Sequence, residues 1–145
     1  MYLIDTNIIS ELRKKDRADS GVTEFFQQAI EKELELFIST ITVGELRRGI
    51  ELIRHRGDES QADILERWFD SIIIDFSSHI LDFTEPEAQT WGYLRVPHYE
   101  NALDKQIAAT ALTHDLILVT RNTADFLGTG VQLLNPFKKK LSSRN

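Results

Sequence analysis

Short, continuous apolar runs alternate along this chain with longer stretches of helical periodicity. The apolar runs are candidate β-strands, because strands of a buried parallel sheet are short and apolar on both faces. The longer stretches carry apolar residues three and four positions apart, which is typical of amphipathic helices. The apolar runs lie at 2–4, 36–39, 71–76, 116–120 and 131–134.

Helices are expected between these runs. In the segment "TVGEL", Thr42 and Glu45 have the spacing of a capping box, so a helix should begin there and end near Arg56. The next helix should run antiparallel to it across the turn at Gly57-Asp58. The full set of expected helices covers about 7–14, 20–32, 42–56, 58–70, 78–94 and 102–114.

Alternating short strands and helices indicate parallel βαβ units, and therefore an α/β sandwich. A length of 145 residues predicts one domain over 1–145. In open parallel sheets, functional sites form beyond the carboxyl ends of the strands. Asp5 follows the first apolar run directly, and Thr120-Arg121-Asn122 follows the most apolar one, "LILV".

Four carboxylates stand at such strand ends or beside apolar stretches. Asp5 ends the first run, and Glu45 adjoins an apolar helical stripe. Asp104 has apolar residues three, four, seven and eight positions after it, so it continues a buried stripe. Asp125 lies a few residues beyond "LILV". Taken together these positions are unusual, since a buried carboxylate is costly unless it is paired or binds a metal.

Each acid also has a purely structural explanation. Asp5 could accept backbone N–H bonds where a helix begins, and Glu45 could complete the capping box with Thr42. Asp104 could complement the N-terminal end of a helix dipole, and Asp125 could organise an Asx-turn. Taken singly, the structural explanation is favoured for every one of them.

An oxygen-only set of carboxylates favours a hard cation, with Mg²⁺ or Mn²⁺ as the best fit. The chain has no cysteine, and its four histidines show no metal-ligand spacing. Such a site suits phosphodiester hydrolysis, because a metal lowers the pKa of its bound water. Polar side chains that could orient the carboxylates follow the same strands: Thr6, Asn7, Thr120 and Asn122.

Composition narrows the function further. A formal net charge of -6 opposes broad adhesion to nucleic acid, which needs many basic contacts to phosphate. It leaves a nuclease possible, because bound divalent cations make an acidic site locally positive. No apolar run is long enough to span a membrane, and no basic leader precedes the first run. The absence of cysteine is compatible with the cytoplasm and with other compartments.

Four segments in series resemble the PIN-domain family, and within it the VapC/FitB-like toxins of type II toxin–antitoxin pairs. They are "YLIDTNIISEL", "TVGELRRGI", "LDKQIAATALTHDLILVTRNTADF" and "GVQLLNPF". The resemblance implies a three-layer α/β/α sandwich with a parallel central sheet, and an endoribonuclease that depends on Mg²⁺ or Mn²⁺. The acids of the family match the four noted above. Asp5 and Asp104 would be direct metal ligands, while Glu45 and Asp125 would act directly or through water.

The resemblance also implies partners. Family members commonly form homodimers with a groove leading to the acids, and the cognate antitoxin lays a segment along that groove. A larger complex with the antitoxin is a further expectation, and no membrane is involved. Arg47, Arg48 and the basic segment 13–17 are candidates for RNA phosphate contacts, although solvated helix surface explains them equally well. Three aromatic residues suit either a partner surface or the core: Trp91, Tyr93 and Tyr99.

Other functional classes fit less well. A DNA-directed nuclease is the main alternative enzyme, because metal-assisted hydrolysis does not itself select the sugar. A non-catalytic regulatory protein could also use this scaffold. A receiver-type signalling module needs adjacent acids after the first strand and a lysine after the last, and "DTN" and "VQLLNPF" supply neither. A haloacid-dehalogenase-like phosphatase would need D-x-D after the first strand, where this chain has "DTN".

Overall fold

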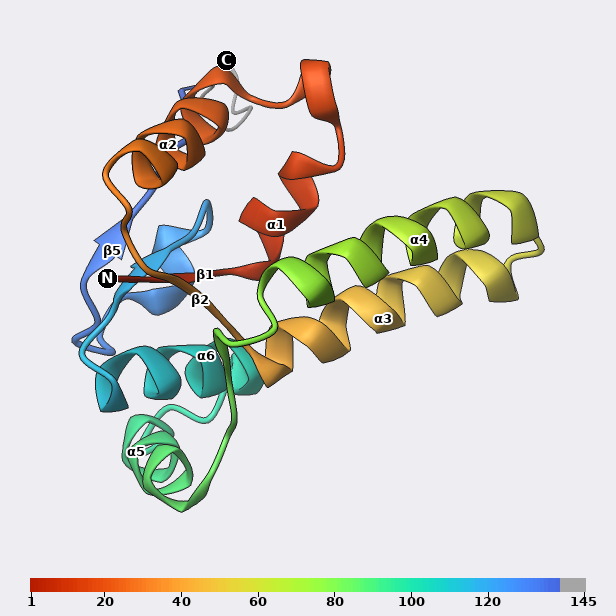
Figure 1. Ribbon diagram of the computed structural model, residues 1–145. Coiled ribbons are helices and arrows are strands. Elements are labelled where there is room, and N and C mark those ends of the chain that lie inside the picture. Colours follow the sequence, from red (N-terminus) through yellow and green to blue (C-terminus); the bar gives the residue numbers. More distant parts are fainter. Residues whose placement is uncertain (139–145) are drawn as a thin grey trace, which may run out of the picture.

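The computed structural model describes residues 1–138 and contains a five-stranded parallel sheet between layers of helices (Figure 1). The strand order is β3-β2-β1-β4-β5, and each neighbouring pair is parallel. This confirms the expected three-layer α/β/α sandwich. The strands are β1 (Tyr2–Ile4), β2 (Leu36–Ser39), β3 (Ile80–Leu81), β4 (Ile117–Val119) and β5 (Leu133–Leu134).

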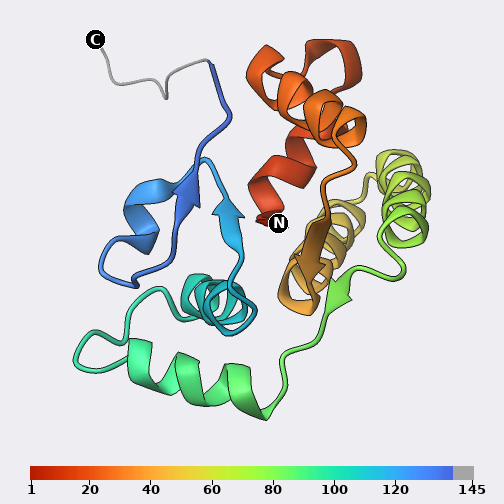
Figure 2. The ribbon, with the colours of Figure 1, turned by 60° about the vertical axis from the view of Figure 1, so that its left-hand side comes forward.

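Within residues 1–138, six α-helices flank the sheet. Figure 2 shows α5 alongside α6, on the opposite side of the molecule from α1 and α2. No helix within residues 1–138 has the length and apolarity needed to cross a membrane. The α-helices are α1 (Thr6–Leu12), α2 (Ser20–Glu31), α3 (Thr40–His55), α4 (Glu59–Asp75), α5 (Glu85–Leu94) and α6 (Ala102–Thr113), and two 3-10 turns are η1 (Lys15–Arg17) and η2 (Thr123–Phe126).

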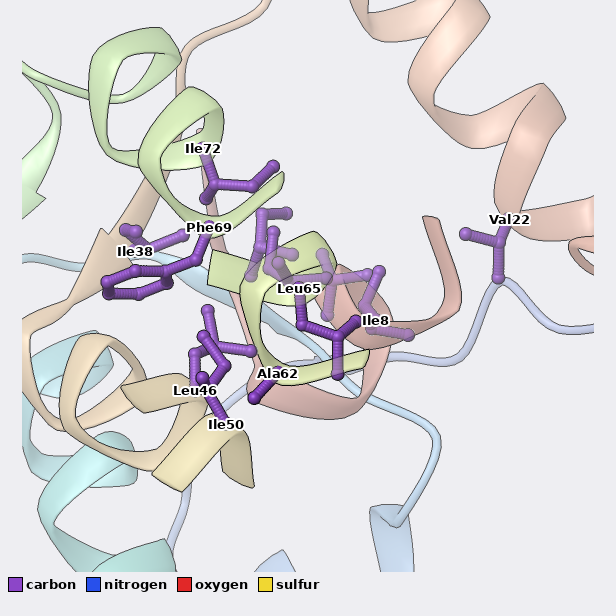
Figure 3. Close-up of a cluster of buried hydrophobic side chains, with 12 residues drawn as sticks. Ile8, Val22, Ile38, Leu46, Ile50, Ala62, Leu65, Phe69 and Ile72 are labelled. Carbon is purple, nitrogen blue, oxygen red and sulfur yellow. The ribbon is translucent and has the colours of Figure 1, made fainter. Parts of the chain in front are cut away.

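Successive residues of the central strands point to opposite faces of the sheet. Ile4 and Val119 belong to a core formed with α1, α2, α3 and α4. Figure 3 shows other members of this core, among them Ile8, Leu46 and Leu65. Leu3 and Leu118 belong to a second core, formed mainly with α6 and η2. All four side chains are fully buried, and each such burial is worth about 1.5–3 kcal/mol. Burial on both faces explains why these strands are uninterrupted apolar runs.

Helices α3 and α4 form an antiparallel hairpin that extends away from the sheet (Figure 1). The expected turn lies between them, and Gly57 takes a positive φ of 95° there, which glycine adopts without steric cost. At this end of the hairpin Arg54 pairs with four acids of the two helices. The acids are Glu51, Glu59, Asp63 and Glu66.

Three local expectations were wrong. The run at 71–76 is not a strand: α4 continues to Asp75, because Ile72 extends the buried stripe of Leu65 and Phe69. The third strand is instead Ile80–Leu81, so the following helix begins at Glu85 rather than near 78. Helix α3 begins at Thr40 and is capped by Ser39, whose hydroxyl accepts the Thr42 N–H, so Thr42 and Glu45 do not form the capping box.

Candidate active site

Asp5 is both a helix cap and a buried carboxylate. It follows β1 and is the N-cap of α1, where its Oδ1 accepts the Thr6 N–H at 2.8 Å. Its other oxygen accepts the Thr120 hydroxyl at 2.8 Å and the Asn7 amide at 3.4 Å. The residue is only 5% exposed. Burial raises the pKa of Asp5 to about 6, against the opposing effect of the bonds from Thr120 and Thr6.

Thr6 connects Asp5 to Glu45. Its backbone N–H binds Asp5, and its side-chain hydroxyl donates to Glu45 Oε1 at 2.7 Å. Glu45 projects from the second turn of α3, so a residue of α1 links carboxylates from two separate parts of the chain. The negative charges of Asp104 and Glu45 also raise the pKa of Asp5, which shows that both acids lie near it.

Polar residues that follow β4 hold the other side of Asp5. The Asn7 amide reaches Thr120 Oγ1 at 3.3 Å, and Asn7 Oδ1 accepts the Arg121 N–H at 3.1 Å. Thr120 is fully buried, and its hydroxyl oxygen also accepts the Asn122 N–H at 3.1 Å. Asn122 therefore takes part through its backbone, while its side chain is exposed.

Asp104 and Asp125 complete the set from α6 and η2. Asp104 lies in the first turn of α6 and is half-buried, and its pKa is raised by burial and then by the charges of Asp125 and Glu45. Asp125 is exposed. Within residues 1–138, no hydrogen bond to either carboxylate is formed. The Asn101 side chain makes no capping bond, although the residue occupies the N-cap position of α6.

The four acids form a coupled electrostatic group rather than a closed cage of ligands. Among the described residues, no three histidine, aspartate or glutamate side chains are arranged to hold a metal ion. The donor set is nevertheless all oxygen, which suits Mg²⁺ or Mn²⁺. Mg²⁺ commonly keeps several waters and uses only one or two carboxylates directly, so it does not require a closed protein cage. The raised pKa of Asp5 marks an electrostatic cost that a cation would offset.

A groove leads from this site along the α3–α4 hairpin. Its inner part is a hollow of about 320 Å³ lined by Thr6, Glu45 and apolar side chains such as Trp68. It adjoins a wider hollow of about 830 Å³, because both are lined by Arg13, Leu65 and Trp68. The wider part is basic, with lining residues that include Arg13, Lys14, Lys15, Arg17 and Arg67.

The two arginines of α3 differ in their surroundings. Arg47 pairs with Glu51 at 3.0 Å and lies 5.0 Å from the centre of the Phe69 ring, so it is part of the hairpin. It also approaches Glu66 at 3.6 Å. Arg48 is exposed, and no ion pair to it forms in the part of the chain that the structure describes.

The aromatic residues around α5 divide between packing and surface. Trp91 is half-buried, and its indole N–H donates to the Ala102 carbonyl at 3.1 Å. Tyr93 and Tyr99 are 83% and 71% exposed. Two further apolar side chains nearby, Val96 and Leu103, are also exposed. Trp91 therefore packs within the fold, whereas the two tyrosines belong to an apolar surface.

Sequence reasoning missed two buried hydroxyl residues beside the site. Ser39 and Thr42 are 1% and 0% exposed, and Thr42 Oγ1 lies 3.1 Å from Thr6 Oγ1. A signal for Ser39 was present in the sequence, because it ends β2 as Asp5 follows β1 and Thr120 follows β4. The interpretation of Thr42 as a helix cap obscured its contact with Thr6.

The arrangement of acids at the carboxyl edge of a parallel sheet defines a class of protein. A family model described as PIN domain matches residues 2–129, and the chain belongs to the PIN-domain family.

Individual relatives agree with this assignment over nearly their whole length. The chain is 34% identical to Toxin FitB of Neisseria gonorrhoeae, covering 94% of this chain and 99% of that protein. It is 27% identical to VapC ribonuclease Y4jK of Sinorhizobium fredii, covering 95% of this chain and 99% of that one.

Comparison with solved structures agrees with the assignment to the PIN-domain family. The crystal structure of FitAcB from Neisseria gonorrhoeae is similar with a TM-score of 0.81 and 34% identity, over 94% of this chain and 98% of that one. A toxin–antitoxin complex from Klebsiella pneumoniae is similar with a TM-score of 0.63 and 27% identity, over 96% of this chain and all of that one.

Proposed function

We propose that this protein is the toxin of a toxin–antitoxin pair and a metal-dependent endoribonuclease that hydrolyses RNA phosphodiester bonds in the cytoplasm. One observation carries the chemical part of the proposal. Asp5 is a buried carboxylate, fixed by three hydrogen bonds, whose pKa is raised by burial and by the neighbouring acids Asp104 and Glu45. Strongly perturbed carboxylates of this kind are concentrated at functional sites.

The proposed cofactor is Mg²⁺ or Mn²⁺. Asp5 and Asp104 would hold it directly, with Glu45 and Asp125 acting directly or through water. When bound, the cation lowers the pKa of a water and stabilises charge on the phosphate. Its charge would also offset the burial and the mutual repulsion that raise the pKa values of Asp5 and Asp104.

The protein's own residues would orient the acids. Thr120 and Asn7 donate to one oxygen of Asp5, and Thr6 donates through its N–H to the other oxygen. Asp5 therefore has little freedom to rotate. The Thr6 hydroxyl restrains Glu45 in the same way. Carboxylates held like this can bind the cation without a large loss of side-chain conformational entropy.

The groove beside Thr6 and Glu45 is the proposed path for RNA and for the antitoxin. Basic side chains at its outer part, including Arg13 and Lys15, suit contacts with phosphate or with acidic groups. Arg48 is the better placed of the two α3 arginines for a phosphate contact, because Arg47 is already paired. The relatives named as toxins and toxin–antitoxin complexes support an antitoxin partner.

A homodimer, alone or within a larger complex with the antitoxin, is part of the same proposal. The exposed apolar residues near α5, among them Tyr93, Val96 and Tyr99, support a contact with another chain. Size-exclusion chromatography with light scattering tests this, since the dimer predicts twice the mass of one chain and a monomer would contradict it.

The decisive test is cleavage of RNA by single-site variants in Mn²⁺. Asp5→Asn and Asp104→Asn should each lower cleavage by more than the ~10–100-fold that loss of an outer-shell partner typically causes. Asp70→Asn is the matched control, because Asp70 is an exposed acid of α4 outside the site. Full cleavage by folded Asp5→Asn would contradict the proposed site. Cleavage of single-stranded DNA in preference to RNA would contradict the proposed substrate.

A further inference from the structure

A chain of three hydroxyl groups ends on Glu45. Ser39 Oγ lies 3.4 Å from Thr42 Oγ1, which lies 3.1 Å from Thr6 Oγ1, which lies 2.7 Å from Glu45 Oε1. The three residues come from the end of β2 and from the first turns of α3 and α1. Ser39 and Thr42 are almost completely shielded from solvent.

The direction of the hydrogen bonds in this chain is determined by Glu45. An ionised carboxylate has no proton to donate, so the Thr6 hydroxyl must give its single proton to Glu45. Thr6 Oγ1 can then only accept from Thr42, and the Thr42 oxygen accepts from Ser39. Ser39 in turn accepts the Thr42 N–H at 3.1 Å. Every hydroxyl donates once, in one direction, toward Glu45.

The Thr42 hydroxyl is not needed to cap helix α3. Ser39 caps α3 through the Thr42 backbone N–H, which needs no Thr42 hydroxyl. A buried threonine of α6, Thr110, shows the common alternative: its hydroxyl donates to the Gln106 carbonyl one turn earlier, at 3.0 Å. Thr42 Oγ1 instead lies 3.1 Å from the Thr6 hydroxyl of α1, and it donates there once Thr6 gives its own proton to Glu45.

We propose that Thr42 is a positioning residue, which fixes the Thr6 hydroxyl and through it the distance between the Glu45 and Asp5 carboxylates. Thr6 binds Asp5 with its N–H and Glu45 with its O–H, so its side-chain rotamer sets how the two acids face each other. Among residues 1–138, only one hydrogen bond besides that to Glu45 restrains the rotamer, and it is the bond with Thr42. The inference rests on the proposed metal site and adds a residue to it.

The test measures Mn²⁺ binding by the metal-free chain without RNA, by calorimetric titration. Thr42→Val removes the hydroxyl and keeps the shape, and it should weaken Mn²⁺ binding by about 10-fold, at the lower end of the range for outer-shell partners. Thr42→Ser keeps the hydroxyl and should bind within about twofold of the parent chain. Thr110→Val is the control for loss of a buried threonine hydroxyl, and it should leave Mn²⁺ binding unchanged.

A second measurement separates positioning from general destabilisation. In a Glu45→Gln background, Thr42→Val should weaken Mn²⁺ binding much less than it does in the parent chain, because both residues act through the Thr6 hydroxyl. An equal loss in both backgrounds would overturn the inference. Thr42→Ala replaces Thr42→Val in the same comparison if the valine variant does not fold.

Failure of this inference differs from failure of the proposed function. If Asp5→Asn and Asp104→Asn lose Mn²⁺ binding while folded Thr42→Val binds like the parent chain, only the role of Thr42 is wrong. If Asp5→Asn and Asp104→Asn also bind Mn²⁺ like the parent chain, the metal site itself is wrong and the inference is overturned with it.

Discussion

The two halves of the candidate site are built differently. Asp5 is buried and accepts bonds from Thr6, Asn7 and Thr120. Asp104 and Asp125 lie in the first turn of a helix and in a 3-10 turn, and their carboxylates accept no hydrogen bond from residues 1–138. The first half is fixed by packing and hydrogen bonds, whereas the carboxylates of the second half interact with the other acids through charge.

The two halves therefore differ in what orders their carboxylates. The hydrogen bonds around Asp5 form with the sheet, because they join residues after β1 to residues after β4. Within residues 1–138 no hydrogen bond restrains the carboxylates of Asp104 and Asp125, so under the proposed function the bound cation would order them. The two halves should consequently respond differently to pH and to substitution.

The largest expected difference is in the pH dependence of stability without metal. The pKa of Asp5 is raised from its ordinary value of 3.8 to about 6, so the native state binds this proton more tightly than the unfolded chain. The resulting stabilisation is complete below about pH 4 and is lost as the pH rises through 6. A rise of about two pKa units is worth roughly 3 kcal/mol.

Asp5→Asn should therefore remove much of the fall in unfolding free energy between pH 4 and pH 7, measured by urea denaturation in EDTA. Asp125→Asn is the comparison from the other half of the site, and its stability should follow the parent chain across this range. Equal flattening by both variants would show that the two halves do not differ in this respect.

A smaller effect is expected from Thr120→Val, which removes the hydroxyl that donates to Asp5 at 2.8 Å. Loss of a hydrogen bond to a buried charged group costs about 1–3 kcal/mol. The cost should be greater at pH 8 than at pH 5, because the ionised carboxylate depends more on its donors. The pKa of Asp5 should also rise further, since the Thr120 bond lowers it.

Urea denaturation at both pH values measures this effect, with Thr110→Val as the control. Within the described residues, the Thr110 hydroxyl binds only a carbonyl of its own helix, so its loss should cost less and with no dependence on pH between 5 and 8. A pH-independent cost for Thr120→Val would argue against its role as a donor to ionised Asp5.

The smallest expected effect on stability is that of Asp125→Asn. Asp125 is exposed, so the change in unfolding free energy should stay within about 0.5 kcal/mol. The pKa of Asp104 should nevertheless fall, because the Asp125 charge is one of the causes that raise it. Carbon-13 NMR titration of the Asp104 carboxyl in metal-free protein measures this change, and an unaltered pKa would contradict the coupling.

Local sequence predicted the elements that depend on near neighbours. The strands at Tyr2–Ile4 and Leu36–Ser39 have the expected bounds, and α6 ends within one residue of its expected end. The run at 71–76 was misjudged because a short apolar segment is compatible with a strand or a buried helix. Packing against α3 decided it, since Leu65, Phe69 and Ile72 lie on one stripe in contact with that helix.

In the candidate site too, local sequence predicts some features and tertiary packing decides others. The residue types and their places after β1 and β4 single out Asp5 and Thr120 from the sequence, because parallel strands bring their carboxyl ends to one edge. Which oxygen of Asp5 meets which donor is a property of the packed molecule. The contact of Thr42 with Thr6 spans 36 residues, and no local pattern encodes it.

The sequence by itself determined the alternation of strands and helices, the oxygen-only character of the acids and the family to which they belong. The first two follow from residue type and short-range periodicity, and the family follows from the resemblance of four segments in series. Only the tertiary structure decided that Asp5 is buried, that Thr6 joins it to Glu45 and that Arg47 is part of the hairpin. The reason is physical: pKa shifts and hydrogen bonds depend on which distant segments exclude water from a group, and packing alone decides that.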